Sequence, residues 1–118
     1  MSGPEKYGLL TTTVATRDDA VKIADALLSE KLAACVQFLP IQSLYSWKGE
    51  VRNEAEILLL IKTRASLFED AMQAIKAIHP YETPEIVACD FVAGSAAYFA
   101  WITEVTRAPI QCLRRSPA

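Results

Sequence analysis

The chain has 118 residues and a mass of 13.0 kDa, the size of one ordinary domain, which leaves no room for separate cofactor and substrate domains. Hydrophobic residues make up 52% and charged residues 22%, a balance that excludes an intrinsically disordered chain. The formal net charge of -2 excludes the general attraction of a basic protein to nucleic acids or anionic membranes.

The first third of the chain predicts a strand, a helix and a second strand. Residues 7–14 are rich in β-branched side chains without helical spacing, which is typical of a strand. Thr16 is expected to cap a helix that runs to about Lys31, because apolar side chains then recur at every third or fourth position. Residues 32–39 predict a mostly buried strand that ends at Pro40.

The middle of the chain predicts a long hairpin. Residues 42–49 alternate between polar and apolar side chains, and residues 48–50 have the composition of a turn. Residues 54–63 predict the returning strand, whose uninterrupted apolar middle indicates that both of its faces are covered.

The last third of the chain predicts a helix, a strand and a closing helix. Ser66 is expected to cap a helix that stops at His79-Pro80, since proline disfavours helical backbone in the residue before it. A loop over residues 81–84 then leads to a strand over residues 84–92. The closing helix, over residues 96–105, is apolar nearly all round, so one side of it is expected to be covered.

These elements together form a doubled β-α-β unit. This order predicts an α+β, ferredoxin-like (split β-α-β) sandwich with a mostly antiparallel sheet, a long hairpin between the second and third strands, and an extra C-terminal helix. A single domain is expected over residues 1–118, with its core over about 7–105 and a tail over 106–118. The apolar fraction is high for so short a chain, and a subunit interface would cover the excess.

Nothing in the sequence directs the chain out of the cytoplasm. The first six residues have no apolar core, and the longest apolar run, residues 57–61, is far shorter than the roughly 20 residues that span a bilayer. The three cysteines are odd in number and form no Cys-x-x-Cys pair, so we expect neither a disulfide framework nor a zinc site.

The single histidine, His79, has two interpretations. It is a candidate metal ligand or general base, because its ordinary pKa lies near 6.5; as a structural residue it would bond a neighbouring carbonyl at the helix end. A nucleophilic pair of Cys35 with His79 is a further hypothesis, although Cys35 lies in an apolar strand where thiols are usually inert.

The predicted hairpin carries carboxylates and aromatic rings at strand spacing. Glu54 and Glu56 are two residues apart and share a face, as candidate acid–base groups or as a solvated edge. Tyr45 and Trp47 also share a face, as a binding platform or as packing. The sequence contains no phosphate-binding loop, nucleophile elbow or zinc-protease motif, so we expect no enzymatic activity.

Four ordered segments resemble the CutA family of divalent-cation tolerance proteins: residues 30–36 (EKLAACV), 43–49 (SLYSWKG), 60–63 (LIKT) and 79–86 (HPYETPEI). The aromatic residues 98–101 (YFAW) fit the same pattern, so the resemblance covers about Leu9 to Val105.

The resemblance implies a cytoplasmic homotrimer of ferredoxin-like subunits, similar in assembly to the P-II signalling proteins, with no obligatory cofactor. It also implies non-enzymatic tolerance of copper or another divalent cation. It places three groups of residues: a metal site of His79, Glu82 and Glu85; an inter-subunit cleft of Tyr45, Trp47, Glu56, Lys62 and Tyr81; and trimer packing by Tyr98 and Trp101.

One departure from the family pattern affects the metal site. Thr12 and Ile78 stand where some bacterial members carry a cysteine and a second histidine, so weaker and less selective metal binding is expected. Two alternatives therefore remain open: a P-II-like sensor that binds a small anionic metabolite near Lys62, and a trimeric scaffold for partners.

Overall fold

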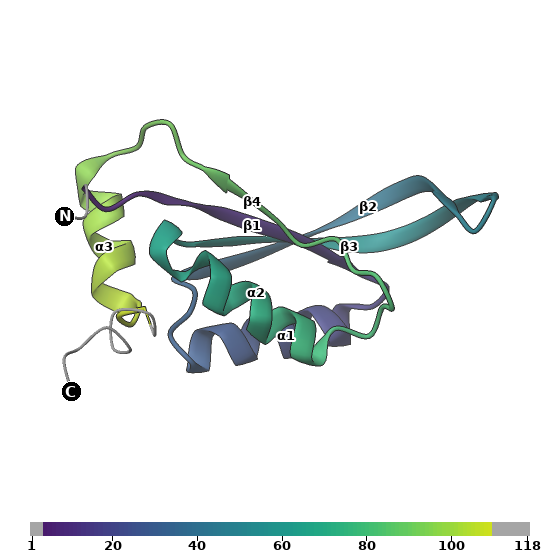
Figure 1. Cartoon of the computed structure of the whole chain (residues 1–118), viewed down its shortest axis with the longest axis horizontal. Helices are drawn as coiled ribbons and strands as arrows, with labels where there is room; N and C mark the ends of the chain where they lie inside the picture. The colour runs from purple at the N-terminus through teal and green to yellow at the C-terminus, as the bar shows by residue number, and fades with distance from the viewer. Residues whose placement is uncertain (1–3, 110–118) are drawn as a thin grey trace.

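The computed structural model describes residues 4–109 of the chain. Its elements, in chain order, are β1 (Tyr7–Val14), α1 (Arg17–Ser29), β2 (Cys35–Trp47), β3 (Glu50–Arg64), the 3-10 turn η1 (Ala65–Leu67), α2 (Phe68–Ile78), β4 (Val87–Asp90) and α3 (Ala96–Val105). The hairpin of β2 and β3 projects past the helices at one end of the molecule, and α3 lies at the other end (Figure 1).

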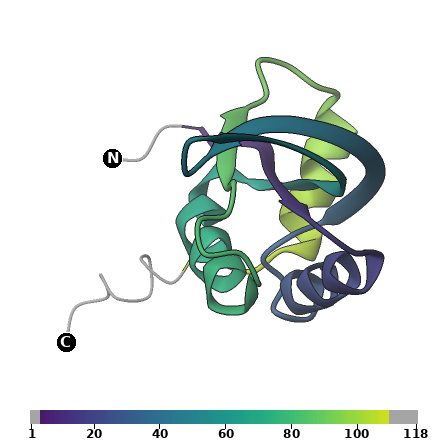
Figure 2. The same ribbon diagram turned by 90° about the vertical axis from the view of Figure 1, so that its right-hand side faces the viewer.

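The four strands form one sheet in the order β2-β3-β1-β4, and each neighbouring pair is antiparallel. Helices α1 and α2 lie side by side on one face of this sheet (Figure 2). This order and layering confirm the predicted ferredoxin-like arrangement, the long hairpin and the extra C-terminal helix. The predicted tail falls mainly on residues 110–118, which lie outside the described residues.

The core lies between the sheet and helices α1 and α2. Along β1, Leu10 and Val14 point toward the helices and are fully buried, while Leu9 and Thr11 point to the opposite face, here called the open face. Strand β3 pairs with β1 in register, so Ile61 lies opposite Leu10 and faces the same core. Alternation in two central strands therefore decides which side chains remain available outside the core.

The hairpin is longer than the sequence predicts. We expected a strand to end at Pro40, but β2 runs through it to Trp47, and Pro40 lies opposite Ile57. The prediction was wrong because β2 is the edge strand of the sheet, where the missing amide hydrogen of proline leaves no ladder bond unmade. Lys48 and Gly49 form the turn with positive φ angles of 51° and 80°, as a two-residue turn of type I′ requires.

The ends of two later elements also differ from the prediction. Ser66 does not cap α2; it lies in η1, and its hydroxyl donates to Glu5 at 3.4 Å. Strand β4 covers only Val87–Asp90 because it pairs with the short segment of β1 from Gly8 to Thr11. Helix α3 covers Ala96–Val105 as predicted, and the Ser95 hydroxyl caps it by accepting from the Tyr98 amide at 3.2 Å.

The longest helix among residues 4–109, α1, has 13 residues, and no helix in this range has the length and apolar character needed to span a bilayer.

Candidate functional site: an acidic groove beside the hairpin

An open groove of about 820 Å³, here called the hairpin groove, is lined by residues of the β2–β3 hairpin and of the loop that follows α2. Four glutamates and one arginine line it, together with three aromatic side chains: Glu54, Glu56, Glu82, Glu85, Arg52, Tyr45, Trp47 and Tyr81. The excess of carboxylates makes the groove attractive to cations and unfavourable for anions.

Strand alternation positions the hairpin side of this groove. Glu54 and Glu56 both line it, on the face of β3 that points away from the helices. Tyr45 on β2 reaches across to the same strand, where its hydroxyl donates to Glu54. This hydrogen bond and the nearby carboxylates raise the pKa of Tyr45, so its hydroxyl remains a donor at neutral pH.

The loop side of the groove is joined to the hairpin by Tyr81. Its hydroxyl donates to Oε2 of Glu56 at 2.7 Å. Burial raises the pKa of Tyr81 far above its ordinary value, and the hydrogen bond to Glu56 and the negative charge there add to the effect. Glu56 is only 7% exposed although it lines the groove, and no ion pair among residues 4–109 includes it.

Both ring nitrogens of His79 are used within the chain. Nε2 lies 2.9 Å from the Thr13 carbonyl and 3.1 Å from Oγ1 of Thr12, while Nδ1 accepts a hydrogen bond from the Tyr81 amide at 3.1 Å. An Nδ1 that accepts and an Nε2 that donates to a carbonyl define a neutral imidazole with its proton on Nε2. Burial lowers the pKa of His79, against smaller opposing effects of the Thr13 bond and of Asp19 and Glu56.

The three predicted metal ligands are not brought together within one chain. Glu82 lies 3.9 Å from the Lys48 ammonium, and Glu85 accepts from the Thr11 hydroxyl at 2.9 Å. Among residues 4–109, no three His, Cys, Asp or Glu side chains are grouped so that they could share a metal ion. His79 contacts β1 and the loop through both nitrogens, which is the structural interpretation of this residue.

Several predicted cleft residues do line the hairpin groove, but Lys62 does not. Tyr45, Trp47, Glu56 and Tyr81 are all part of its lining. The Lys62 ammonium instead lies 5.8 Å from the centre of the Tyr98 ring, near the end of β3 that is distant from the turn.

The aromatic residues predicted to pack a trimer lie together on α3. The Tyr98 and Trp101 rings are 5.6 Å apart, and the two side chains are 37% and 39% exposed. Cys35 lies opposite Lys62 in the sheet and is not among the polar contacts of the His79 ring.

Arg52 is a lining residue that we did not single out from the sequence. Its place could have been predicted from strand alternation, because Arg52 precedes Glu54 by two residues on β3 and therefore shares its face.

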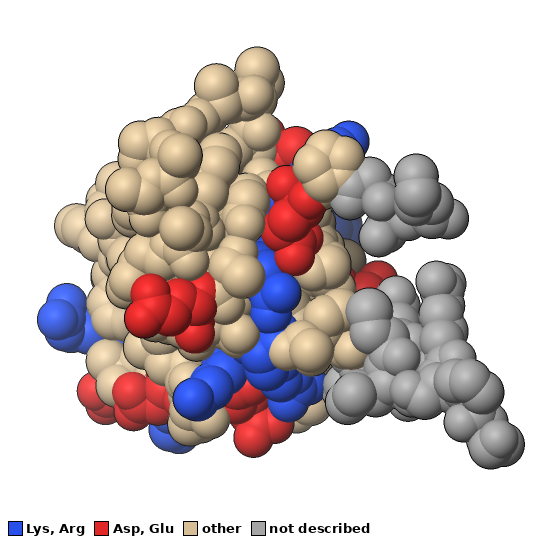
Figure 3. All heavy atoms as spheres, turned by 90° about the vertical axis from the view of Figure 1, so that its left-hand side faces the viewer, with Lys and Arg blue, Asp and Glu red and all other residues tan. Residues whose placement is uncertain are grey.

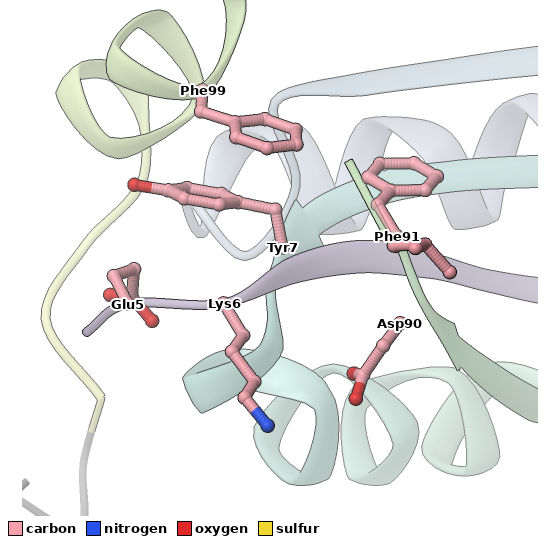
Figure 4. A pocket seen from close by; sticks show the side chains of 7 residues that line it. Glu5, Lys6, Tyr7, Asp90, Phe91 and Phe99 are labelled. Atoms are coloured by element: carbon pink, nitrogen blue, oxygen red, sulfur yellow. The ribbon is translucent and has the colours of Figure 1, made fainter. Parts of the chain in front are cut away.

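A second, smaller groove of about 400 Å³ lies at the beginning of β1. The Tyr7 and Phe99 rings stack 4.4 Å apart, and Phe91 lies parallel to Phe99 at 6.2 Å. Figure 4 shows these rings on one side of β1, with Lys6 and Asp90 on the other. Acidic and basic side chains are interspersed on this end of the molecule, and uncharged atoms cover its upper part (Figure 3). The aromatic rings of this smaller groove pack against one another. The hairpin groove is therefore the stronger candidate site.

Fold and groove together define a small α+β protein with an acidic groove, which is formed by one long hairpin and the loop after the second helix. A family model described as CutA1 divalent ion tolerance protein matches residues 9–105. The chain therefore belongs to the CutA1 divalent ion tolerance family.

Individual relatives agree with this family. The chain is 44% identical over 95 residues to the divalent-cation tolerance protein CutA of Thermus thermophilus, covering 80% of this chain and 92% of that one. It is 43% identical over 96 residues to the chloroplastic CutA of Arabidopsis thaliana, covering 80% of this chain but 53% of the plant protein. The chain thus spans about half the length of the plant relatives.

Solved structures show the same fold. The crystal structure of CutA1 from Oryza sativa superposes with a TM-score of 0.83 at 39% identity, covering 86% of this chain and 94% of that one. The periplasmic divalent cation tolerance protein CutA of Archaeoglobus fulgidus has a TM-score of 0.82 at 34% identity, covering 84% and 97%.

Proposed function

We propose that this protein provides divalent-cation tolerance without catalysing a reaction, as a cytoplasmic homotrimer that binds copper or another divalent cation weakly in the hairpin groove. The observation that carries this proposal is Glu56, a carboxylate that is 7% exposed and faces a groove lined by three further glutamates. A buried carboxylate without a positive partner is costly, and a bound cation would offset that cost.

The geometry favours carboxylate oxygens over His79 as the ligands. Both imidazole nitrogens already have partners, so coordination by His79 would break the bond to Thr13 or the bond to Tyr81. Sites built mainly from carboxylates and carbonyls suit hard divalent cations, while copper(II) prefers sites that include imidazole. Weak and poorly selective binding is therefore the expected behaviour of this groove.

The trimer in this proposal is supported by apolar surface on the open face of the sheet. Leu39 is 40% and Val87 51% exposed, and Leu58 and Leu60 on β3 lie on the same face and are only half-buried. Contact between subunits would remove this surface from water, which is the ordinary driving force for assembly. The same surface supports the alternative of a scaffold for partner proteins. The acidic groove does not favour the alternative of an anionic metabolite.

Calorimetric titration with copper(II) and with magnesium tests the proposed cation site. Glu56→Gln should weaken binding at least tenfold, because it removes the buried charge and keeps the shape of the side chain. Glu69→Gln, an exposed change of the same kind on α2, should leave the affinity unchanged. Equal affinities for the unmodified protein, Glu56→Gln and Glu69→Gln would reject the groove as the cation site.

A further inference from the structure

The chain places one of its own ammonium groups at the mouth of the hairpin groove. The Nζ atom of Lys48, in the hairpin turn, lies 5.6 Å from the centre of the Trp47 ring and 3.9 Å from Oε2 of Glu82. Trp47 and Glu82 both line the groove, one from the hairpin and one from the loop. An aromatic face opposite a carboxylate is the arrangement by which proteins recognise organic ammonium groups.

The groove continues from this mouth toward further groups of the same two kinds. Tyr45 and Tyr81 add aromatic rings, and Glu54 and Glu56 add carboxylates. Glu56 is the most buried of these acids, and its one hydrogen-bond partner among the described residues is the uncharged hydroxyl of Tyr81. The groove therefore contains a buried carboxylate, that of Glu56, which has no positively charged partner among residues 4–109. The Lys48 ammonium at the mouth pairs with Glu82 and not with Glu56.

The size of the groove also points to a ligand larger than a metal ion. Its volume of about 820 Å³ falls in the range of roughly 300–1,000 Å³ that is usual for sites of small organic molecules. A single ion could be held by one or two of the carboxylates and would leave the aromatic rings without a role. A flexible chain that carries several ammonium groups could contact the rings and the acids together.

We propose that the hairpin groove binds an aliphatic polyamine, with one ammonium group over Trp47 beside Glu82 and another at Glu56, and that Lys48 competes for the outer position. The proposal shares the carboxylates of the cation site proposed above, but it depends in addition on Trp47, which a metal ion does not need.

Lys48 is suited to this competing role because its ion pair with Glu82 is weak. The Lys48 and Glu82 side chains are 72% and 73% exposed, and exposed ion pairs of this kind contribute little to stability. A ligand ammonium tethered to a second one deeper in the groove would displace it readily. Removal of the Lys48 ammonium should therefore strengthen polyamine binding.

Titration calorimetry with spermidine at about 0.15 M salt, where surface attraction is largely screened, tests the proposal. Lys48→Asn removes the ammonium and keeps a residue type that tolerates positive φ. This variant should bind spermidine several-fold more tightly than the unmodified protein. The matched control Lys22→Asn makes the same charge change on the exposed surface of α1 and should bind like the unmodified protein.

A second variant separates the polyamine from a metal ion. Trp47→Leu should weaken spermidine binding about tenfold or more and leave the affinity for magnesium unchanged, because only the organic cation uses the ring. Spermidine binding without measurable metal binding would support this proposal and reject the metal function. Two results would overturn it: no spermidine binding by the unmodified protein or by Lys48→Asn, or equal affinities for Lys48→Asn and Lys22→Asn.

Discussion

His79 and Tyr81 are joined by a hydrogen bond in which the Tyr81 amide donates to Nδ1 of the imidazole at 3.1 Å. The other ring nitrogen of His79 contacts Thr13 on β1, and the Tyr81 hydroxyl contacts Glu56 on β3. One histidine therefore connects the end of α2, the central strand and the acidic groove. Its role in the described structure is to position the loop that forms one wall of the groove.

The pH dependence of stability should report this role of His79. Burial lowers the pKa of His79 in the folded protein below its ordinary value of about 6.5, so the unfolded chain binds the extra proton more readily. The contribution of His79 is then fully present above pH 6.5 and is lost as the pH falls through the lower pKa of the folded state. We expect the free energy of unfolding to decrease from pH 7.5 to 5.5, as measured by urea unfolding at one protein concentration.

His79→Asn is the matched variant for this measurement, since His79 is the only histidine in the sequence. The variant should be less stable at pH 7.5 by about 1–3 kcal/mol, because partly buried hydrogen bonds are lost. It should also lack the histidine component of the decrease between pH 7.5 and 5.5. If the free energies of unfolding of the two proteins changed in parallel with pH, His79 would not be the source of the pH dependence.

Gly8 and Gly49 should respond differently to a change to alanine. A Cβ atom at Gly8 would overlap the carbonyl oxygen of Cys89 and lie 2.8 Å from Cζ of Phe68. We expect Gly8→Ala to cost about 1–3 kcal/mol or more, because β1 and β4 would have to separate. At Gly49 there is open space, so Gly49→Ala should cost only the roughly 1–2 kcal/mol of a positive φ. Denaturant unfolding of both variants measures the difference, and a larger cost at Gly49 would contradict it.

The proposed trimer should depend on Leu60. This side chain lies on the open face of β3, opposite Thr11 on one neighbouring strand and Gln37 on the other. Leu60→Lys places a charge on that face without disturbing the core, so we expect smaller assemblies with an unchanged circular dichroism spectrum. Val21→Lys is the matched control, because Val21 is 39% exposed on α1. Sedimentation velocity measures both variants, and a Leu60→Lys protein that sediments like the control would rule out this face as the interface.

Ser66 and Ser95, which lie near the starts of α2 and α3, should also respond differently to a change to alanine. The Ser95 hydroxyl accepts from the Tyr98 amide, so Ser95→Ala should cost about 1 kcal/mol. Ser66 lies in η1 and makes a long contact to Glu5, so Ser66→Ala should change stability by less than about 0.5 kcal/mol. Thermal unfolding of the two variants under the same conditions compares them directly. Equal losses would mean that the local hydrogen bond at Ser95 contributes nothing.

The order of the elements could be predicted because each one has a local pattern. The β-branched residues of Tyr7–Val14, the Thr16 cap and the helix end at His79-Pro80 act over a few positions, and the structure confirms all three. The end of β2 could not be predicted in this way. Proline stops a strand in the centre of a sheet but not at its edge, and the strand order, not the local sequence, places Pro40 at the edge.

In the candidate site, too, some features follow from the local sequence and others depend on the tertiary structure. The sequence by itself determined the ferredoxin-like order of elements and the shared face of Glu54 and Glu56. Its resemblance to the CutA family indicated four aromatic and acidic residues that line the groove. Only the tertiary structure decided that Lys62 lies with Tyr98 and that both nitrogens of His79 are occupied. The physical reason is the distance along the chain: His79 meets a carbonyl 66 residues away, and such a contact depends on how β1 and α2 pack, which no local pattern encodes.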